Sequence, residues 1–126
     1  MKKKTNAFNI VYDFMQNYNN LKYNQSIEID PNVTDPVVIA ELIKAQTKTK
    51  MVMATITKAI AETEKEYKAK SKELYTRVFS QYFVFEKTYE EIAEQENISE
   101  KTARKYITEI IQNLAVKIFG VEALEQ

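Results

Sequence analysis

Apolar residues recur at helical spacing near the end of the chain. Ala103, Ile107, Ile110 and Leu114 follow one another at steps of four, three and four residues, which places them on one face of a helix. Ser99 precedes this face, and serine is a favoured N-cap because its hydroxyl accepts a hydrogen bond from the first helical turn. The pattern predicts a helix that begins after Ser99 and packs through this face.

A shorter helix is predicted immediately before it. Thr88 and Glu91 have the spacing of a capping box, in which each side chain bonds the backbone N–H of the other. Asn97 lies where the chain must reverse, and asparagine tolerates a left-handed backbone better than most residues. Ile92 and the small Ala93 are expected to face inward, where a small side chain lets two helices cross closely. Together these signals predict a helix-turn-helix over residues 88–114.

The first third of the chain carries one clear amphipathic pattern. An aromatic and aliphatic stripe at three- and four-residue steps predicts a helix over residues 6–19. The stripe consists of Phe8, Val11, Tyr12, Met15 and Tyr18. Residues 19–35 are rich in Asn, Asp and Ser and contain a proline, so they are predicted to be a connection. Residues 27–29 could pair briefly as a strand.

A long helix is predicted from Pro36, because a capping residue precedes it and proline fits the first helical position. The polar residues 46–50 predict a bend or break. Beyond them, Met53, Ile56, Ile60 and Tyr67 fit a heptad seam. Two interpretations of this seam stay open: packing onto the helix over residues 6–19, or a seam between two copies of the chain.

The most apolar segment is expected to form the floor on which the helix-turn-helix rests. Its members are Leu74, Tyr75, Val78, Phe79, Tyr82 and Phe83. Gly120 is expected to end the last helix as a left-handed cap. We therefore predict an all-α fold with a helical N-terminal region at residues 1–70, used for oligomerisation or partner binding. A helix-turn-helix domain at residues 71–120 and a tail at residues 121–126 follow.

The amino-acid composition limits the kinds of catalytic and metal sites that the chain can form. The 126 residues include one Gly and two Pro, which favours helix, and neither Cys nor His. Disulfides and thiolate metal sites are thereby excluded, and the commonest general base is missing. We expect no enzymatic activity, no cofactor and no bound metal. Because no apolar run approaches the ~18 residues that span a bilayer, we expect no membrane association and a cytoplasmic location.

The face opposite the apolar stripe of the last helix carries side chains suited to DNA. Hydroxyl, amide and cationic groups bind phosphate oxygens and base edges, and Gln112 belongs to the same surface. Arg104, Lys105 and Thr108 are the best candidates for base contacts, with Arg104 on the flank. The predicted contacts to double-stranded DNA are Lys87, Thr88, Lys101, Thr102, Arg104, Lys105 and Thr108.

Net charge argues against tight binding by one copy. The chain has 18 basic and 18 acidic residues, whereas DNA-binding domains usually carry a basic surplus. Residues 86–126 contain five Lys or Arg and nine Glu. Because neutralised phosphates supply much of the affinity for DNA, we expect the domain to need a second copy, as in a homodimer, or a partner such as RNA polymerase.

Two segments resemble the fourth region of bacterial sigma factors and the related LuxR-type helix-turn-helix. They read Tyr-Glu-Glu-Ile-Ala at residues 89–93 and Asn-Ile-Ser-Glu-Lys-Thr at residues 97–102. Residues 78–88 resemble the preceding apolar helix and link of that module, so the resemblance covers roughly residues 72–120. A short chain of this kind is most similar to ArpU/RinA-like late-gene transcription regulators of phages infecting Gram-positive bacteria. Two departures loosen the expected core: Glu96 replaces a buried aliphatic residue, and Ala103 replaces a more common valine.

The resemblance implies a sequence-specific transcription regulator, encoded by a phage and acting on late genes in a bacterial host cell. Two other functions fit the same pattern. One is a DNA-packaging protein akin to a small terminase subunit, and the other is a helical adaptor that docks on RNA polymerase. A pair of amphipathic helices that binds no nucleic acid is the simplest alternative.

Overall fold

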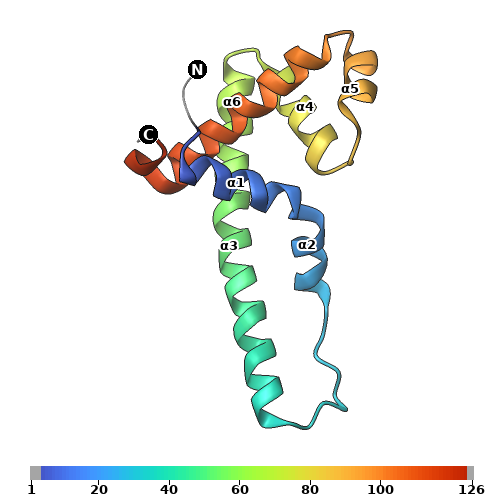
Figure 1. Cartoon of the computed structure of the whole chain (residues 1–126), viewed down its shortest axis with the longest axis vertical. Coiled ribbons are helices and arrows are strands. Elements are labelled where there is room, and N and C mark those ends of the chain that lie inside the picture. Colours follow the sequence, from blue (N-terminus) through green and yellow to red (C-terminus); the bar gives the residue numbers. More distant parts are fainter. Residues whose placement is uncertain (1–3, 125–126) are drawn as a thin grey trace.

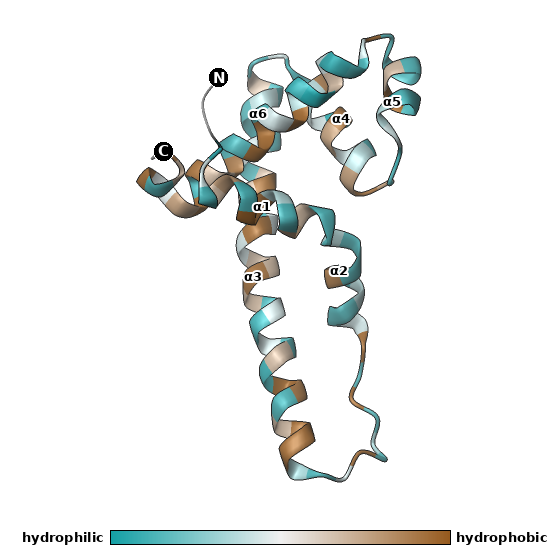
Figure 2. Ribbon diagram, viewed as in Figure 1, coloured by the Kyte–Doolittle hydropathy of each residue, from teal (hydrophilic) through white to brown (hydrophobic). Residues whose placement is uncertain are grey.

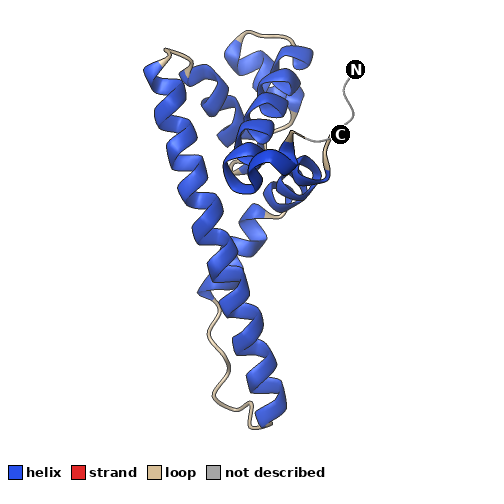
Figure 3. Ribbon diagram, turned by 90° about the vertical axis from the view of Figure 1, so that its left-hand side faces the viewer, coloured by secondary structure: helices blue, strands red, loops and turns tan. Residues whose placement is uncertain are grey.

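The computed structural model describes residues 4–124 and confirms the all-α prediction, with no strand in this part of the chain (Figures 1 and 3). A body of short helices lies at one end, and a long helix projects from it as an arm. The elements are α1 (Asn6–Gln16), α2 (Tyr18–Ser26), α3 (Pro36–Ala69), α4 (Glu73–Phe83), α5 (Tyr89–Glu96), α6 (Glu100–Phe119) and a final 3-10 turn, η1 (Gly120–Ala123). No helix within residues 4–124 is long and apolar enough to cross a bilayer.

The connection predicted over residues 19–35 is confirmed for residues 27–35 and is wrong before them, because residues 18–26 form helix α2. Asn17 separates α1 from α2, and its side-chain amide donates to the carbonyl of Asp13 (2.8 Å), which closes the end of α1. The helix α2 has no buried residue and a weak apolar pattern. A contact with a distant part of the chain stabilises it, since the Asn19 amide donates to the Val84 carbonyl (2.9 Å). Tertiary contacts of this kind override a weak local preference.

The predicted break in the long helix is also wrong, because α3 runs unbroken for 34 residues. Its start is as predicted: the Asp35 carboxylate accepts from the Val37 N–H (2.9 Å), and Pro36 occupies the first turn. In the polar interval the Thr49 hydroxyl donates to the Ala45 carbonyl four residues back (3.1 Å). Such a hydroxyl meets its hydrogen-bonding need without leaving the helix, so polarity alone does not end it.

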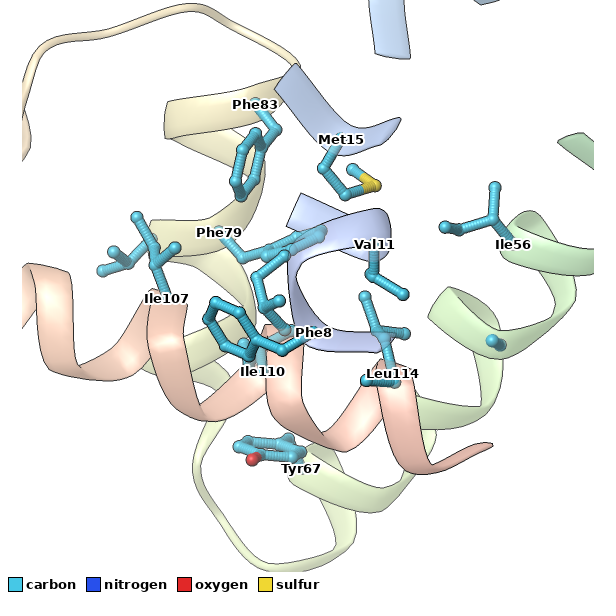
Figure 4. Close-up of a cluster of buried hydrophobic side chains, with 14 of the residues drawn as sticks. Phe8, Val11, Met15, Ile56, Tyr67, Phe79, Phe83, Ile107, Ile110 and Leu114 are labelled. Carbon is cyan, nitrogen blue, oxygen red and sulfur yellow. The ribbon is translucent and has the colours of Figure 1, made fainter. Parts of the chain in front are cut away.

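One core joins the N-terminal helices to the helix-turn-helix (Figure 4). The helix α1 contributes Phe8, Val11 and Met15, each at most 3% exposed. The floor predicted from the sequence is present, since Val78, Phe79 and Phe83 of α4 are buried. The core further includes Ile56 and Tyr67 of α3, and Ile107, Ile110 and Leu114 of α6.

The seam of α3 is filled within the chain, and α3 packs mainly on α6, α2 and α4 rather than on α1. Met53, Ile56 and Tyr67 are buried, and so is Thr63, whose hydroxyl donates to the Ala59 carbonyl (2.8 Å). That bond explains how a polar residue is tolerated at a seam position. The first half of α3 contributes no buried residue.

Gly120 ends α6 as predicted, with a positive φ of 61°. Its ψ of −131° differs from the predicted left-handed helical conformation, because the chain turns at once into η1. Ala123 of this turn is buried against the body. Residues 125–126 of the predicted tail lie outside the described residues.

Candidate nucleic-acid interface

The start of α5 is fixed by the predicted capping box. The Glu91 N–H donates to the Thr88 hydroxyl (3.1 Å), and the Thr88 N–H donates to the Glu91 carboxylate (3.0 Å). These bonds lower the pKa of Glu91, since both the Thr88 backbone and its hydroxyl favour the charged carboxylate. Thr88 remains exposed at the end of the helix.

The turn and the second helix also form as predicted. Asn97 adopts φ 55° and ψ 48°, which is left-handed backbone. The Thr102 N–H donates to the Ser99 hydroxyl (3.0 Å), so Ser99 is the N-cap of α6. The Ser99 hydroxyl in turn donates to the Thr102 hydroxyl (2.9 Å). Thr102 is therefore half-buried and partly engaged by the cap.

The apolar face of α6 is buried throughout, as its spacing predicted. Ala103, Ile107, Ile110 and Leu114 are at most 1% exposed. This fixes the rotation of α6, because a helix that buries one face leaves the opposite face outward. Lys101, Lys105 and Thr108 lie on that outward face, at steps of four and three residues, and all three are exposed.

Arg104 is exposed on the flank of this surface, with 58% of its side chain accessible. Its guanidinium lies 4.7 Å from the centre of the Tyr89 ring and 3.8 Å from the Glu100 carboxylate. A cation above an aromatic ring is attracted by the negative face of the ring. Arg104 is thus held toward α5 while its charge remains accessible.

Two residues of the predicted surface are engaged elsewhere. The Gln112 amide donates to the Ala123 carbonyl (3.0 Å), so the final turn η1 limits the free surface of α6 at this residue. Lys87 is half-buried before α5 and donates to the Gln95 side chain (2.6 Å). The outward surface therefore extends from Lys101 to Thr108, about two helical turns.

Glu96, which stands where the family usually has a buried aliphatic residue, forms an ion pair that the sequence did not predict. Arg77 of α4 donates through two nitrogens to the Glu96 carboxylate (2.9 Å each), and the buried Gln81 donates to it as well (2.7 Å). The Arg77 guanidinium is the main cause of a lowered pKa at Glu96. A two-point ion pair of this kind replaces the missing aliphatic contact and joins α4 to α5.

The charge balance of the interface remains mixed. Glu90, Glu91, Glu94 and Glu100 are exposed on or beside α5, whereas the ion pair with Arg77 neutralises Glu96. The cations of α6 therefore stand next to a negative helix. An acidic neighbour weakens phosphate binding by the isolated domain, in line with the sequence-based expectation.

Comparison with known proteins identifies the C-terminal part. Residues 72–114 match the family model described as Sigma-70, region 4. No curated protein and no solved structure matches the chain. Domains of this family bind DNA and the RNA polymerase core, and the matched residues span α4, α5 and most of α6. The C-terminal half of the chain therefore carries a helix-turn-helix domain of the sigma-70 region 4 type.

Proposed function

We propose that this protein is a sequence-specific DNA-binding transcription regulator that reads the major groove with the first two turns of α6. The observation that carries the proposal is the outward surface of Lys101, Lys105 and Thr108, which stands free opposite a fully buried face. A recognition helix needs this combination, because its buried face sets its angle and its N-terminal turns contact the bases.

In this proposal Arg104, Lys105 and Thr108 contact bases or groups next to them. Lys101 and Thr102 at the start of α6 bind phosphates or base edges, and the exposed Thr88 binds backbone at the start of α5. Lys87 is assigned a phosphate contact that requires it to release Gln95. Because a lysine–amide hydrogen bond at the surface is weak, DNA can compete for this ammonium group.

The finer assignment rests on the resemblance to ArpU/RinA-like regulators: a phage-encoded protein that controls late genes in the cytoplasm of a bacterial host. A second candidate is an adaptor that docks on RNA polymerase. The exposed acidic side chains of α5 favour it, since they oppose tight binding to free DNA. Measured affinity for a duplex separates the two candidates.

The test is a double substitution, Arg104→Ala with Lys105→Ala. The unaltered chain would first select a DNA duplex from a random pool. Fluorescence anisotropy would then measure the affinity of each variant for this duplex. We expect affinity to fall at least about thirtyfold, since a lost base contact costs about 1–3 kcal/mol and a lost phosphate contact adds to it. The far-ultraviolet circular dichroism should stay unchanged, because both side chains are exposed.

The matched control removes two cations from exposed positions of α3, Lys65→Ala with Lys68→Ala. It should bind the selected duplex almost as tightly as the unaltered chain. An equal loss of affinity in the two variants would mean that only the net charge of the chain matters for binding, which would contradict the assignment of DNA contacts to α6. If no duplex is selected at low salt while the chain binds RNA polymerase, the adaptor function replaces the regulator.

A further inference from the structure

The arm carries an apolar stripe that the described residues 4–124 leave largely exposed, although α2 packs beside it on α3. Val38, Leu42 and Val52 of α3 are 45%, 40% and 41% exposed, and Ala45 between them is also exposed. With Thr49 these residues are spaced by four, three, four and three residues, which is the repeat of a helix–helix seam. Brown segments in the first half of α3 mark several of the apolar positions of the arm (Figure 2).

The stripe leads into an apolar groove at the base of the arm. The groove has a volume of about 260 Å³ and lies between α1, α3 and the end of α6. Its lining includes Val52, Ile10, Phe14 and Phe119. Stripe and groove thus share Val52 and form one continuous surface. Large connected apolar surfaces on a folded chain usually mark a docking site.

Charge along the arm indicates what docks there. Residues 28–41, at the tip, contain Glu28, Asp30, Asp35 and Glu41 and no Lys or Arg. Residues 42–61 contain Lys44, Lys48, Lys50 and Lys58 and no Asp or Glu. One arm therefore carries an acidic end and a basic middle, and a second arm laid antiparallel would place the acidic end of each arm near Lys50 and Lys58 of the other. Parallel arms would place like charges together, which costs energy.

We infer that two copies of the chain associate through their arms, antiparallel and about a twofold axis near Ala45. The stripe is centred on this residue, so Val38 of one copy lies opposite Val52 of the other. The tip of each arm then enters the groove at the base of the partner's arm. Such an interface is self-complementary, as a twofold dimer requires.

The axis also separates the two bodies. Ile60, which lies where α3 packs on the body, is 15 residues from Ala45. At 1.5 Å per residue the two Ile60 positions are about 45 Å apart along the arms. This spacing exceeds one turn of B-DNA, which is about 34 Å. The inference does not depend on the proposed function, because it concerns the arm alone.

Cysteine cross-linking tests the orientation, and the chain offers a clean background because it has no native cysteine. The variant Ala45→Cys should form a disulfide-linked dimer on mild oxidation, since residues near a twofold axis approach their own copies. Val38→Cys alone should not cross-link, whereas a mixture of Val38→Cys and Val52→Cys chains should. Self-linking of Val38→Cys would show parallel arms and overturn the inference.

The mass of the protein in solution tests whether the apolar stripe of α3 forms the dimer interface. Light scattering of the unaltered chain should give twice the 14.7 kDa of one chain, and Leu42→Glu should shift it to a single chain with unchanged helicity. The control is Met51→Glu, which alters an apolar side chain 67% exposed on another face of α3 and should leave the dimer intact. A monomeric unaltered chain, a dimeric Leu42→Glu or a monomeric Met51→Glu would each overturn the inference.

Discussion

At the scale of single residues, the ion pair between Arg77 and Glu96 decides how the helix-turn-helix tolerates an acid in its interior. The Glu96 side chain is 10% exposed and accepts three hydrogen bonds, two from Arg77 and one from Gln81. A partly buried charge is stable only when its partners stay in place. The contacts hold α4 and α5 together and thereby support the recognition helix.

The first prediction concerns acid. The lowered pKa of Glu96 in the folded chain means that the unfolded chain takes up the proton first. The stabilisation is therefore present above the unfolded pKa of about 4.5 and is lost as the pH falls through the folded pKa. Glu96→Gln should lower the melting temperature at pH 7 but have a smaller effect at pH 3.

Thermal unfolding followed by circular dichroism checks this over a range of pH. The control is Glu94→Gln, on the same helix but exposed, which should melt like the unaltered chain at each pH. A constant difference between Glu96→Gln and the unaltered chain from pH 7 to pH 3 would mean that the charge of Glu96 is not what stabilises the contact.

At the scale of elements, the helix boundaries follow local chemistry where the chain caps itself. Thr88, Ser99 and Asp35 each form the predicted cap, because a cap depends only on residues within one turn. The left-handed Asn97 is local in the same sense. Ser71 and Glu86 also have a positive φ, of 56° and 53°, and no residue preference signals them.

The second prediction concerns the turn. Asn97→Ala should destabilise the fold by about 1 kcal/mol, because alanine pays more than asparagine for a left-handed backbone. Asn97→Gly should stay within about 0.5 kcal/mol of the unaltered chain, since glycine adopts this conformation without a steric penalty. Urea unfolding measures both. Equal losses for alanine and glycine would show that the asparagine side chain, and not the backbone conformation, stabilises the turn.

Sequence predicted the helix-turn-helix better than the arm for a physical reason. The buried face of α6 depends on period alone, and all four of its predicted residues are buried. The existence of α2 depends on a contact between distant residues, the Asn19 amide donating to the Val84 carbonyl (2.9 Å). The continuity of α3 depends on a hydroxyl that bonds within the helix, which a polar composition does not reveal. Likewise, nothing near Gln112 in the sequence indicates that Ala123 would engage it.

At the scale of the whole molecule, the N-terminal helices and the matched domain share one hydrophobic core. Phe8 and Val11 of α1 belong to the same cluster as Ile107 and Leu114 of α6. The Tyr67 hydroxyl of α3 donates to the Glu109 carboxylate of α6 (2.8 Å). Burial and this carboxylate raise the pKa of Tyr67 to about 12, so the hydroxyl stays protonated and able to donate at neutral pH.

The third prediction tests that shared core. Phe8→Ala should lower the free energy of unfolding by about 3–5 kcal/mol, because it leaves a cavity in a buried site. Hydrogen exchange should show the amides of α6 losing protection together with those of α1. The control, Tyr23→Ala, removes an aromatic ring that is 67% exposed and should have little effect. Preserved protection of α6 in Phe8→Ala would show two independent folding units.

The unbroken α3 has a geometric consequence. One end of this helix is fixed to α6 through Tyr67 and through an ion pair between Glu66 and Lys117, and the other end lies at the far tip of the molecule (Figure 1). Because the helix has no internal hinge, its length is set by its number of residues, at about 1.5 Å each. A partner bound at the tip therefore lies at a fixed distance from the helix-turn-helix. Only insertions or deletions in α3 could change that distance.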